Sequence, residues 1–136
     1  MSRNPGRPLS PHLTIWKWGP HMLVSILHRV TGAAMALGAT VIFVWWLTAA
    51  AMGPQGYANF LDVFTVKSGK LNIVGALFAI GFTWTFFQHL FSGIRHLVLD
   101  TGAGYELRVN KMGSILTIVG SVVVTALVWA TVLVGR

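Results

Sequence analysis

Two histidines in the second half of the chain have the type and spacing that most directly indicate chemistry. His89 and His96 are seven residues apart, so they share one face of a helix, and Gly93 lies between them. At 1.5 Å per residue, His89 lies about 10 Å deeper in an apolar run than His96. A histidine there is costly without a partner, and Gly93 leaves room for a flat macrocycle or another backbone. The plainer alternative is an interhelical hydrogen bond from His89.

A haem would use only one of these two histidines as an iron ligand. Axial ligands face each other across one iron, whereas His89 and His96 are stacked along one helix. The deeper His89 suits the iron, and His96 can at most touch the haem edge. His12 and His21 precede the first apolar run, so we expect the second axial histidine to come from a partner chain. Four basic residues at the boundary suit the anionic haem propionates: His28, Arg29, Arg95 and His96.

A second polar cluster lies at the start of the first apolar run. Ser25 and Arg29 are four residues apart and share a helix face, and His28 and Gly32 flank that face at the same spacing. The plainer alternative is that Arg29 reaches lipid head groups while His28 lies in the interface. Both clusters meet at one membrane boundary, which is the geometry of a cofactor and a small-molecule site near the cytoplasmic interface.

The composition requires lipid around the elements that carry these residues. Of 136 residues, 54% are hydrophobic and 10% are charged, whereas a soluble domain carries about 25% charged residues. The absence of cysteine excludes disulfides, thiolate-bound iron–sulfur clusters and a cysteine nucleophile. The net charge of +7 fits membrane orientation better than nucleic-acid binding, and no cleavable signal or transit peptide is evident. The three acids are too scattered for a carboxylate metal site: Asp62, Asp100 and Glu106.

Three apolar runs predict an all-α integral membrane protein with three transmembrane helices. About 20 apolar residues suffice to cross a bilayer, and the helices are expected at about 22–52, 71–98 and 112–134. Glycine and proline predict a loop over 53–70 and a turn over 100–111. The chain, 1–136, is expected to form a single membrane-anchor domain. Seven of its ten Lys and Arg residues lie on the N-terminal side of the membrane, so the N-terminal segment 1–21 and the second loop are expected in the cytoplasm.

Three stretches resemble those of one membrane-protein family. Residues 7–15 read Arg-Pro-Leu-Ser-Pro-His-Leu-Thr-Ile, and residues 25–32 fit the pattern Ser-x-x-His-Arg-x-[Ser/Thr]-Gly. Residues 89–100 fit the pattern His-x-x-x-Gly-Ile-Arg-His-x-x-x-Asp. Their order and spacing resemble the cytochrome b subunit of succinate dehydrogenase, the large membrane anchor of respiratory complex II, in its mitochondrial and alphaproteobacterial form.

The resemblance implies a role for each matching position. His89 would be the axial ligand of the haem iron, and Ser25 and Arg29 would contact the quinone. No catalytic residue is expected in this chain. The region around the haem propionates would contain His28, Arg95 and His96.

The resemblance also implies partners, in the inner membrane of a bacterium rather than of a mitochondrion. A second small membrane anchor would complete the helix bundle, share haem b and supply the other axial histidine. A flavoprotein and an iron–sulfur protein would pass electrons from succinate to ubiquinone. Two alternatives remain open: an anchor of a menaquinone-linked fumarate reductase, and a haem-free small membrane subunit for assembly or transport.

Overall fold

The first span is one long helix with a wider turn in its middle. In the computed structural model, which describes residues 6, 8, 12 and 16–135, α1 covers Pro20–Ala33, the π-helical η1 covers Ala34–Ala39, and α2 covers Thr40–Ala51. Pro20 takes the first helical position, where its missing N–H costs nothing. Such π-helical turns are frequent near functional sites. Most of the segment 7–15, which carries the first of the three resemblances, lies outside the described residues.

A short helix follows where the sequence predicted a loop. α3 covers Gly53–Phe64, so the prediction of a loop over 53–70 is wrong for its first twelve residues. The φ of Gly53 is 82°, which lets the chain leave α2 in a new direction, and a proline then starts the helix. The ring of Phe60 is buried and lies 4.9 Å from the ring of Trp45, centroid to centroid. Aromatic packing therefore holds α3 against the end of the first span.

The second span is displaced slightly from its predicted position, and the third is longer than predicted. α4 covers Ile73–Asp100, so it begins and ends two residues later than expected, and α5 covers Leu107–Val134 and begins five residues early. The reversal between them uses Gly102 and Gly104, whose φ angles are 85° and 79°. The sequence prediction missed the start of α5 because the first turns contain polar residues. Such residues are nevertheless compatible with a helix end at a membrane boundary.

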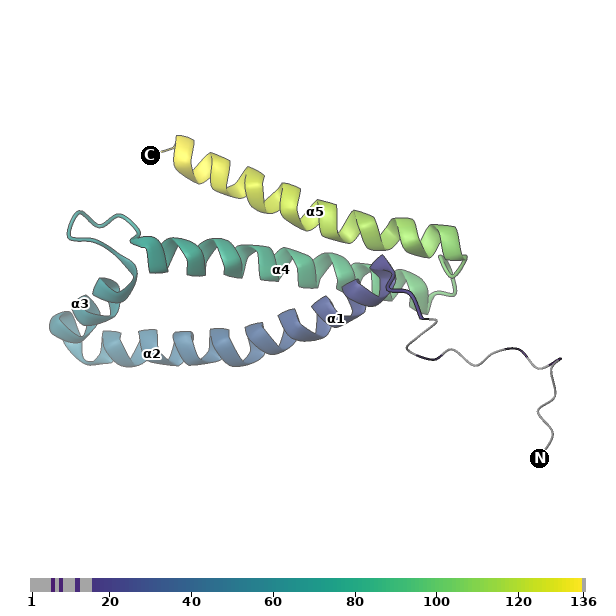
Figure 1. Cartoon of the computed structure of the whole chain (residues 1–136). Helices are drawn as coiled ribbons and strands as arrows, with labels where there is room; N and C mark the ends of the chain where they lie inside the picture. Colours follow the sequence, from purple (N-terminus) through teal and green to yellow (C-terminus); the bar gives the residue numbers. More distant parts are fainter. Residues whose placement is uncertain (1–5, 7, 9–11, 13–15, 136) are drawn as a thin grey trace, which may run out of the picture.

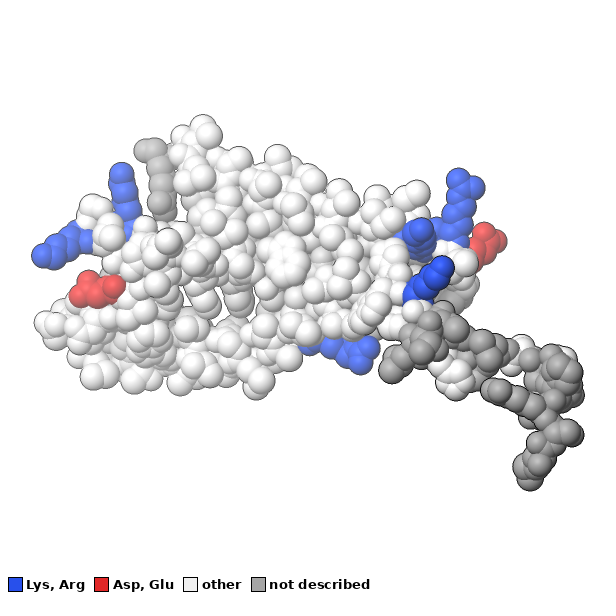
Figure 2. Space-filling model, in the orientation of Figure 1, with Lys and Arg blue, Asp and Glu red and all other residues white. Residues whose placement is uncertain are grey.

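The three long helices lie side by side, with α4 between the first span and α5 (Figure 1). The beginning of α1, the end of α4 and the beginning of α5 lie at one end of the bundle, and α3 lies at the other (Figure 1). Among the described residues, these three helices are long and apolar enough to cross a membrane, which confirms the predicted fold class. Lys and Arg side chains lie mostly toward the two ends (Figure 2).

The interior of the bundle is more polar than its surface. Among the described residues, only three hydrophobic side chains are buried, while seven polar ones are buried and large apolar side chains cover the outside. Helices in lipid gain little from burying apolar groups, so polar and small residues form their contacts. The buried polar side chains are Thr31, Gln88, Ser92, Ser114, Thr117, Ser121 and Thr125.

Candidate functional site

Three histidines from two spans meet where α1 crosses α4. The imidazole of His28 on α1 stacks on that of His89 on α4, with ring centroids 4.0 Å apart and planes 8° apart. The ring of His96 lies 5.0 Å from that of His28 at an angle of 58°. His28 therefore fills the space between the two histidines that the sequence placed on one helix face. We call His28, His89 and His96 the histidine cluster.

Hydrogen bonds from α1 fix the orientation of the His89 ring. Its Nδ1 lies 3.1 Å from the carbonyl oxygen of His28 and 3.2 Å from Oγ1 of Thr31. That threonine hydroxyl lies 2.7 Å from the carbonyl oxygen of Leu27 and donates its proton there, so it accepts from His89. Both partners are then acceptors, which assigns the proton to Nδ1. The lone pair of His89 is left on Nε2.

The sequence left two interpretations of His89 open, a haem ligand and an interhelical hydrogen bond, and this arrangement is compatible with both. The interhelical hydrogen bond exists and uses Nδ1, while Nε2 has no hydrogen-bond partner among the described residues. A metal-ligating histidine commonly donates its second ring N–H to a carbonyl oxygen or a similar acceptor. The same hydrogen bond therefore stabilises the orientation that ligation by Nε2 requires.

Glycine 32 makes the close approach of this ring possible. A Cβ added at Gly32 would lie 2.9 Å from Cε1 of His89, which is closer than real Cβ contacts. A Cβ added at Gly93 would lie 3.7 Å from Cε1 of His28, which is an ordinary contact. Gly32 therefore permits the approach of α1 to His89, and the space that the sequence assigned to Gly93 for a macrocycle stays a prediction.

A buried serine orients the second ring of the stack. Nδ1 of His28 lies 2.8 Å from Oγ of Ser92, and this hydroxyl lies 2.7 Å from the carbonyl oxygen of Gln88. Because the serine donates to that carbonyl, it accepts from Nδ1 of His28. Sequence reasoning missed Thr31 and Ser92, because a hydroxyl in a membrane helix most often bonds only its own backbone.

Ser25 and Arg29 form a pair on α1 at the same end of the bundle. Nη2 of Arg29 lies 3.3 Å from Oγ of Ser25, and its Nε lies 3.3 Å from the carbonyl oxygen of the same serine. The arginine is exposed and the serine is half-buried. Among the serine and threonine side chains of the three spans, all of which are described, only Ser25 and Thr85 do not donate to a backbone carbonyl of their own helix. The Ser25 hydroxyl thus has a proton free for a ligand.

An open groove runs along α4 below His89. It has a volume of about 250 Å³ and is lined by small and aromatic side chains, and by Thr85, which is four residues before His89. A Cβ added at Gly38 or Gly81 would meet nothing within 4 Å, so these two glycines face open space. The groove can hold an apolar group, with the free hydroxyl of Thr85 in its lining.

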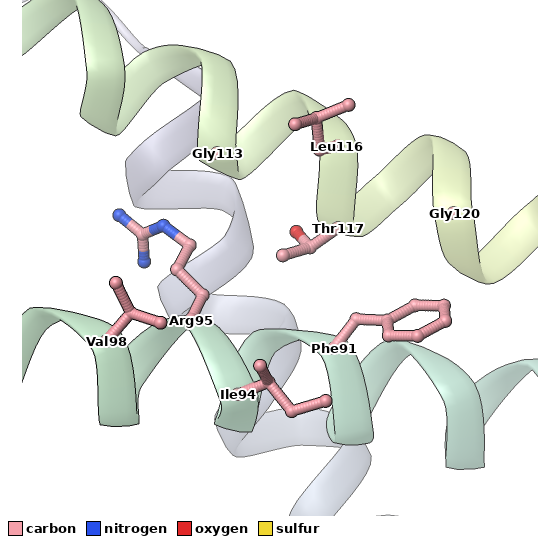
Figure 3. A pocket seen from close by; sticks show the side chains of 8 residues that line it. All are labelled: Phe91, Ile94, Arg95, Val98, Gly113, Leu116, Thr117 and Gly120. Carbon is pink, nitrogen blue, oxygen red and sulfur yellow. The ribbon is translucent and has the colours of Figure 1, made fainter. Parts of the chain in front are cut away.

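The structure places Arg95 apart from the histidine cluster. Its Nη2 donates to Oδ1 of Asn110 on α5 at 2.7 Å, and the side chain lines a groove between α4 and α5 (Figure 3). No hydrogen bond or ring contact among the described residues joins Arg95 to the three histidines. The structure thus brings together His28, His89 and His96 of the predicted haem residues, and directs Arg95 elsewhere.

Comparison with known proteins shows the family. A family model described as succinate dehydrogenase/fumarate reductase transmembrane subunit matches residues 3–128. A succinate dehydrogenase cytochrome b556 subunit of Paracoccus denitrificans is 36% identical over 121 residues, which are 89% of this chain and 88% of that protein. The succinate dehydrogenase cytochrome b556 subunit of Rickettsia conorii is 35% identical over 123 residues, which are 90% of this chain and 90% of that protein.

A mitochondrial relative extends the same similarity. The succinate dehydrogenase cytochrome b560 subunit of Sus scrofa is 36% identical in an alignment of 128 positions that covers 89% of this chain and 71% of that protein. These matches confirm the resemblance that the sequence patterns indicated. The chain belongs to the family of succinate dehydrogenase/fumarate reductase transmembrane subunits.

Proposed function

We propose that this chain is a haem b-binding membrane anchor of succinate:quinone oxidoreductase and that it helps to form the site of ubiquinone reduction. The observation that carries the proposal is the His89 ring, whose Nδ1–H is held by two acceptors and whose Nε2 is free. An imidazole so oriented is a strong axial ligand for a haem iron. The relatives named cytochrome b subunits of succinate dehydrogenase support the same function.

In this proposal His89 would hold the haem iron from α4, and His28 and His96, the rest of the histidine cluster, would lie around the haem edge. His28 and His96 are proposed beside the anionic propionates, because the ring of His28 stacks on that of His89 and the ring of His96 lies 5.0 Å from that of His28. Arg95 was predicted for the same region, and this role stays a prediction. When bound, the haem would supply a one-electron carrier. The chain's own residues orient the ligand through the two acceptors of its Nδ1–H.

Ser25 and Arg29 are proposed to bind the quinone head group. The Ser25 hydroxyl can donate to a quinone carbonyl oxygen, since it accepts from Arg29 and donates to no backbone carbonyl. The guanidinium of Arg29 lies close enough to stabilise negative charge that develops on that oxygen during reduction. The pair thus provides a preorganised donor and a positive charge, while the electrons come from partner subunits.

The proposal requires three partners. This chain contains no cysteine, so iron–sulfur clusters would belong to an iron–sulfur subunit, next to a flavoprotein that oxidises succinate. A second small membrane anchor would supply the axial histidine opposite His89 and share the haem. Large apolar side chains cover the outside of the three spans, which leaves area for both a helical partner and lipid. The assembly is proposed for a bacterial inner membrane, with the N-terminus in the cytoplasm.

Absorption spectra of variant complexes test the haem assignment. In a reduced-minus-oxidised spectrum, His89→Leu should remove or convert the low-spin signal, because the axial nitrogen is lost. His96→Leu is the matched control on the same helix, and it should keep the signal and shift only the reduction potential. Subunit content is measured in each preparation. Loss of the low-spin haem in His96→Leu, with retention in His89→Leu, would reverse the assignment.

The same preparation distinguishes the alternative functions. A complex that carries menaquinone and reduces fumarate would place the chain in a fumarate reductase. A purified complex with no haem spectrum and no flavoprotein would favour a small assembly or transport subunit. Mass spectrometry of the co-purifying subunits and of the extracted quinone separates these outcomes.

A further inference from the structure

An arginine lines an otherwise apolar groove between α4 and α5. The groove has a volume of about 330 Å³, and its walls include Phe91 and Ile94 from α4 and Leu116 from α5 (Figure 3). Gly113 lies next to Arg95, since a Cβ added there would be 3.8 Å from Nε of the arginine. A glycine at this position leaves the guanidinium open to the groove.

The Arg95 guanidinium has unused hydrogen-bond donors beside an apolar groove. Of its five N–H donors, one bonds to Asn110, and no carboxylate pairs with it among the described residues. Arg95 lies five residues before the end of α4, which is about 7.5 Å inside the helix end. A charge among the apolar side chains of this groove is costly without an anion and without acceptors for its protons.

We propose that this groove binds a membrane phospholipid, with its phosphate on Arg95 and one acyl chain in the apolar part. The guanidinium matches two phosphate oxygens, and the Asn110 contact already holds it in place. Phe91 and Gly120 line the deeper end, while Arg95 and Gly113 line the end near the boundary. The polarity of the groove therefore follows the polarity of a lipid, from head group to tail.

The size of the groove favours a lipid chain over a partner helix. A helix with its side chains is about 10 Å wide, so about 330 Å³ holds only about 4 Å of helix, less than one turn. A single acyl chain is much thinner and can follow the groove. A partner helix would also bury the Arg95 charge against apolar side chains, whereas a phosphate neutralises it.

Phospholipid retained by the purified complex tests this inference. Complexes are washed in detergent, and the lipid remaining per complex is measured by mass spectrometry. Arg95→Gln should weaken retention of one tightly held phospholipid by roughly tenfold, which is typical for the loss of charge-assisted hydrogen bonds. Arg108→Gln, which removes an exposed charge near the start of α5, should retain the lipid. Leu116→Trp, which fills the groove, should lose it, and Val119→Trp on an exposed site of α5 should not.

Three outcomes would overturn the inference. Unchanged lipid content in both Arg95→Gln and Leu116→Trp would show that no lipid binds here. If the groove variants lose a membrane subunit rather than a lipid, a helix of that partner subunit occupies the groove. A shifted haem potential in Arg95→Gln, with lipid retained, would return this arginine to the propionates. If the variants fail to assemble, a phospholipid with a photoreactive acyl chain is applied to the wild-type complex. The absence of lipid adducts on residues Phe91–Val98 and Gly113–Gly120 would then count against the inference.

Discussion

Replacement of Thr31 by valine isolates the hydrogen bond that orients His89. Valine has nearly the shape of threonine but cannot accept a proton, so Nδ1–H of His89 keeps only the carbonyl oxygen of His28, at 3.1 Å. Loss of one such hydrogen bond costs about 1 kcal/mol. A hydrogen bond from Nδ1–H makes the ligand more basic and favours ferric iron. If the whole loss falls on the ferric state, the haem potential rises by at most about 40 mV, because 59 mV corresponds to about 1.4 kcal/mol for one electron.

The assay is a redox titration of the haem absorbance in the purified complex. Thr31→Ser keeps the hydroxyl and should keep the wild-type potential. Thr125→Val is a matched control, because Thr125 is also buried but bonds only to the Ser121 carbonyl of its own helix. A Thr31→Val potential equal to that of wild type, or a change no larger than in Thr125→Val, would refute the reasoning.

Three further outcomes follow from the same contacts. Gly32→Ala should lower the haem content, because the added Cβ would lie 2.9 Å from Cε1 of His89. Gly93→Ala is the control and should retain haem, and equal haem content in the two variants would contradict this steric argument. Ser25→Ala should lower succinate:ubiquinone reductase activity roughly tenfold, through loss of one hydrogen bond to a developing anion, while succinate oxidation by an artificial soluble acceptor persists. An equal fall of both activities in an intact complex would argue against a quinone role. Single cysteines at Arg108 and Lys67 should react with an impermeant thiol reagent from the cytoplasmic and the opposite side, respectively, and reaction of both from one side would disprove the three-span topology.

The spans and the position of His89 within the second of them followed from the sequence, because both depend only on hydropathy. The helix α3 did not, since Gly53 and Pro54 are typical of a loop. The signal that indicates it is the spacing of Tyr57, Phe60 and Phe64, at i, i+3 and i+7. That spacing was outweighed by the turn residues, although proline is compatible with the first turn of a helix.

The side of α4 on which each residue lies was predicted less well than its depth. Arg95 and His96 differ by one position, so they point about 100° apart around the helix, and only His96 faces α1. Which neighbour lies on which side depends on the packing of the three helices. The hydrogen bond from His89 to Thr31 depends on the same packing, 58 residues away in sequence. Patterns within one helix carry no information about such a contact.

Rescue of an emptied ligand position tests the central claim most directly. His89→Gly removes the imidazole and leaves a space of its size next to Gly32. The variant complex, in the membrane with its partners, should lose the low-spin haem signal in electron paramagnetic resonance, and added imidazole should restore it by occupying the position of Nε2. Thr31 should then accept the N–H of the added imidazole, so Thr31→Val should weaken the rescue. A low-spin signal that persists in His89→Gly without imidazole would show that His89 does not ligate the iron.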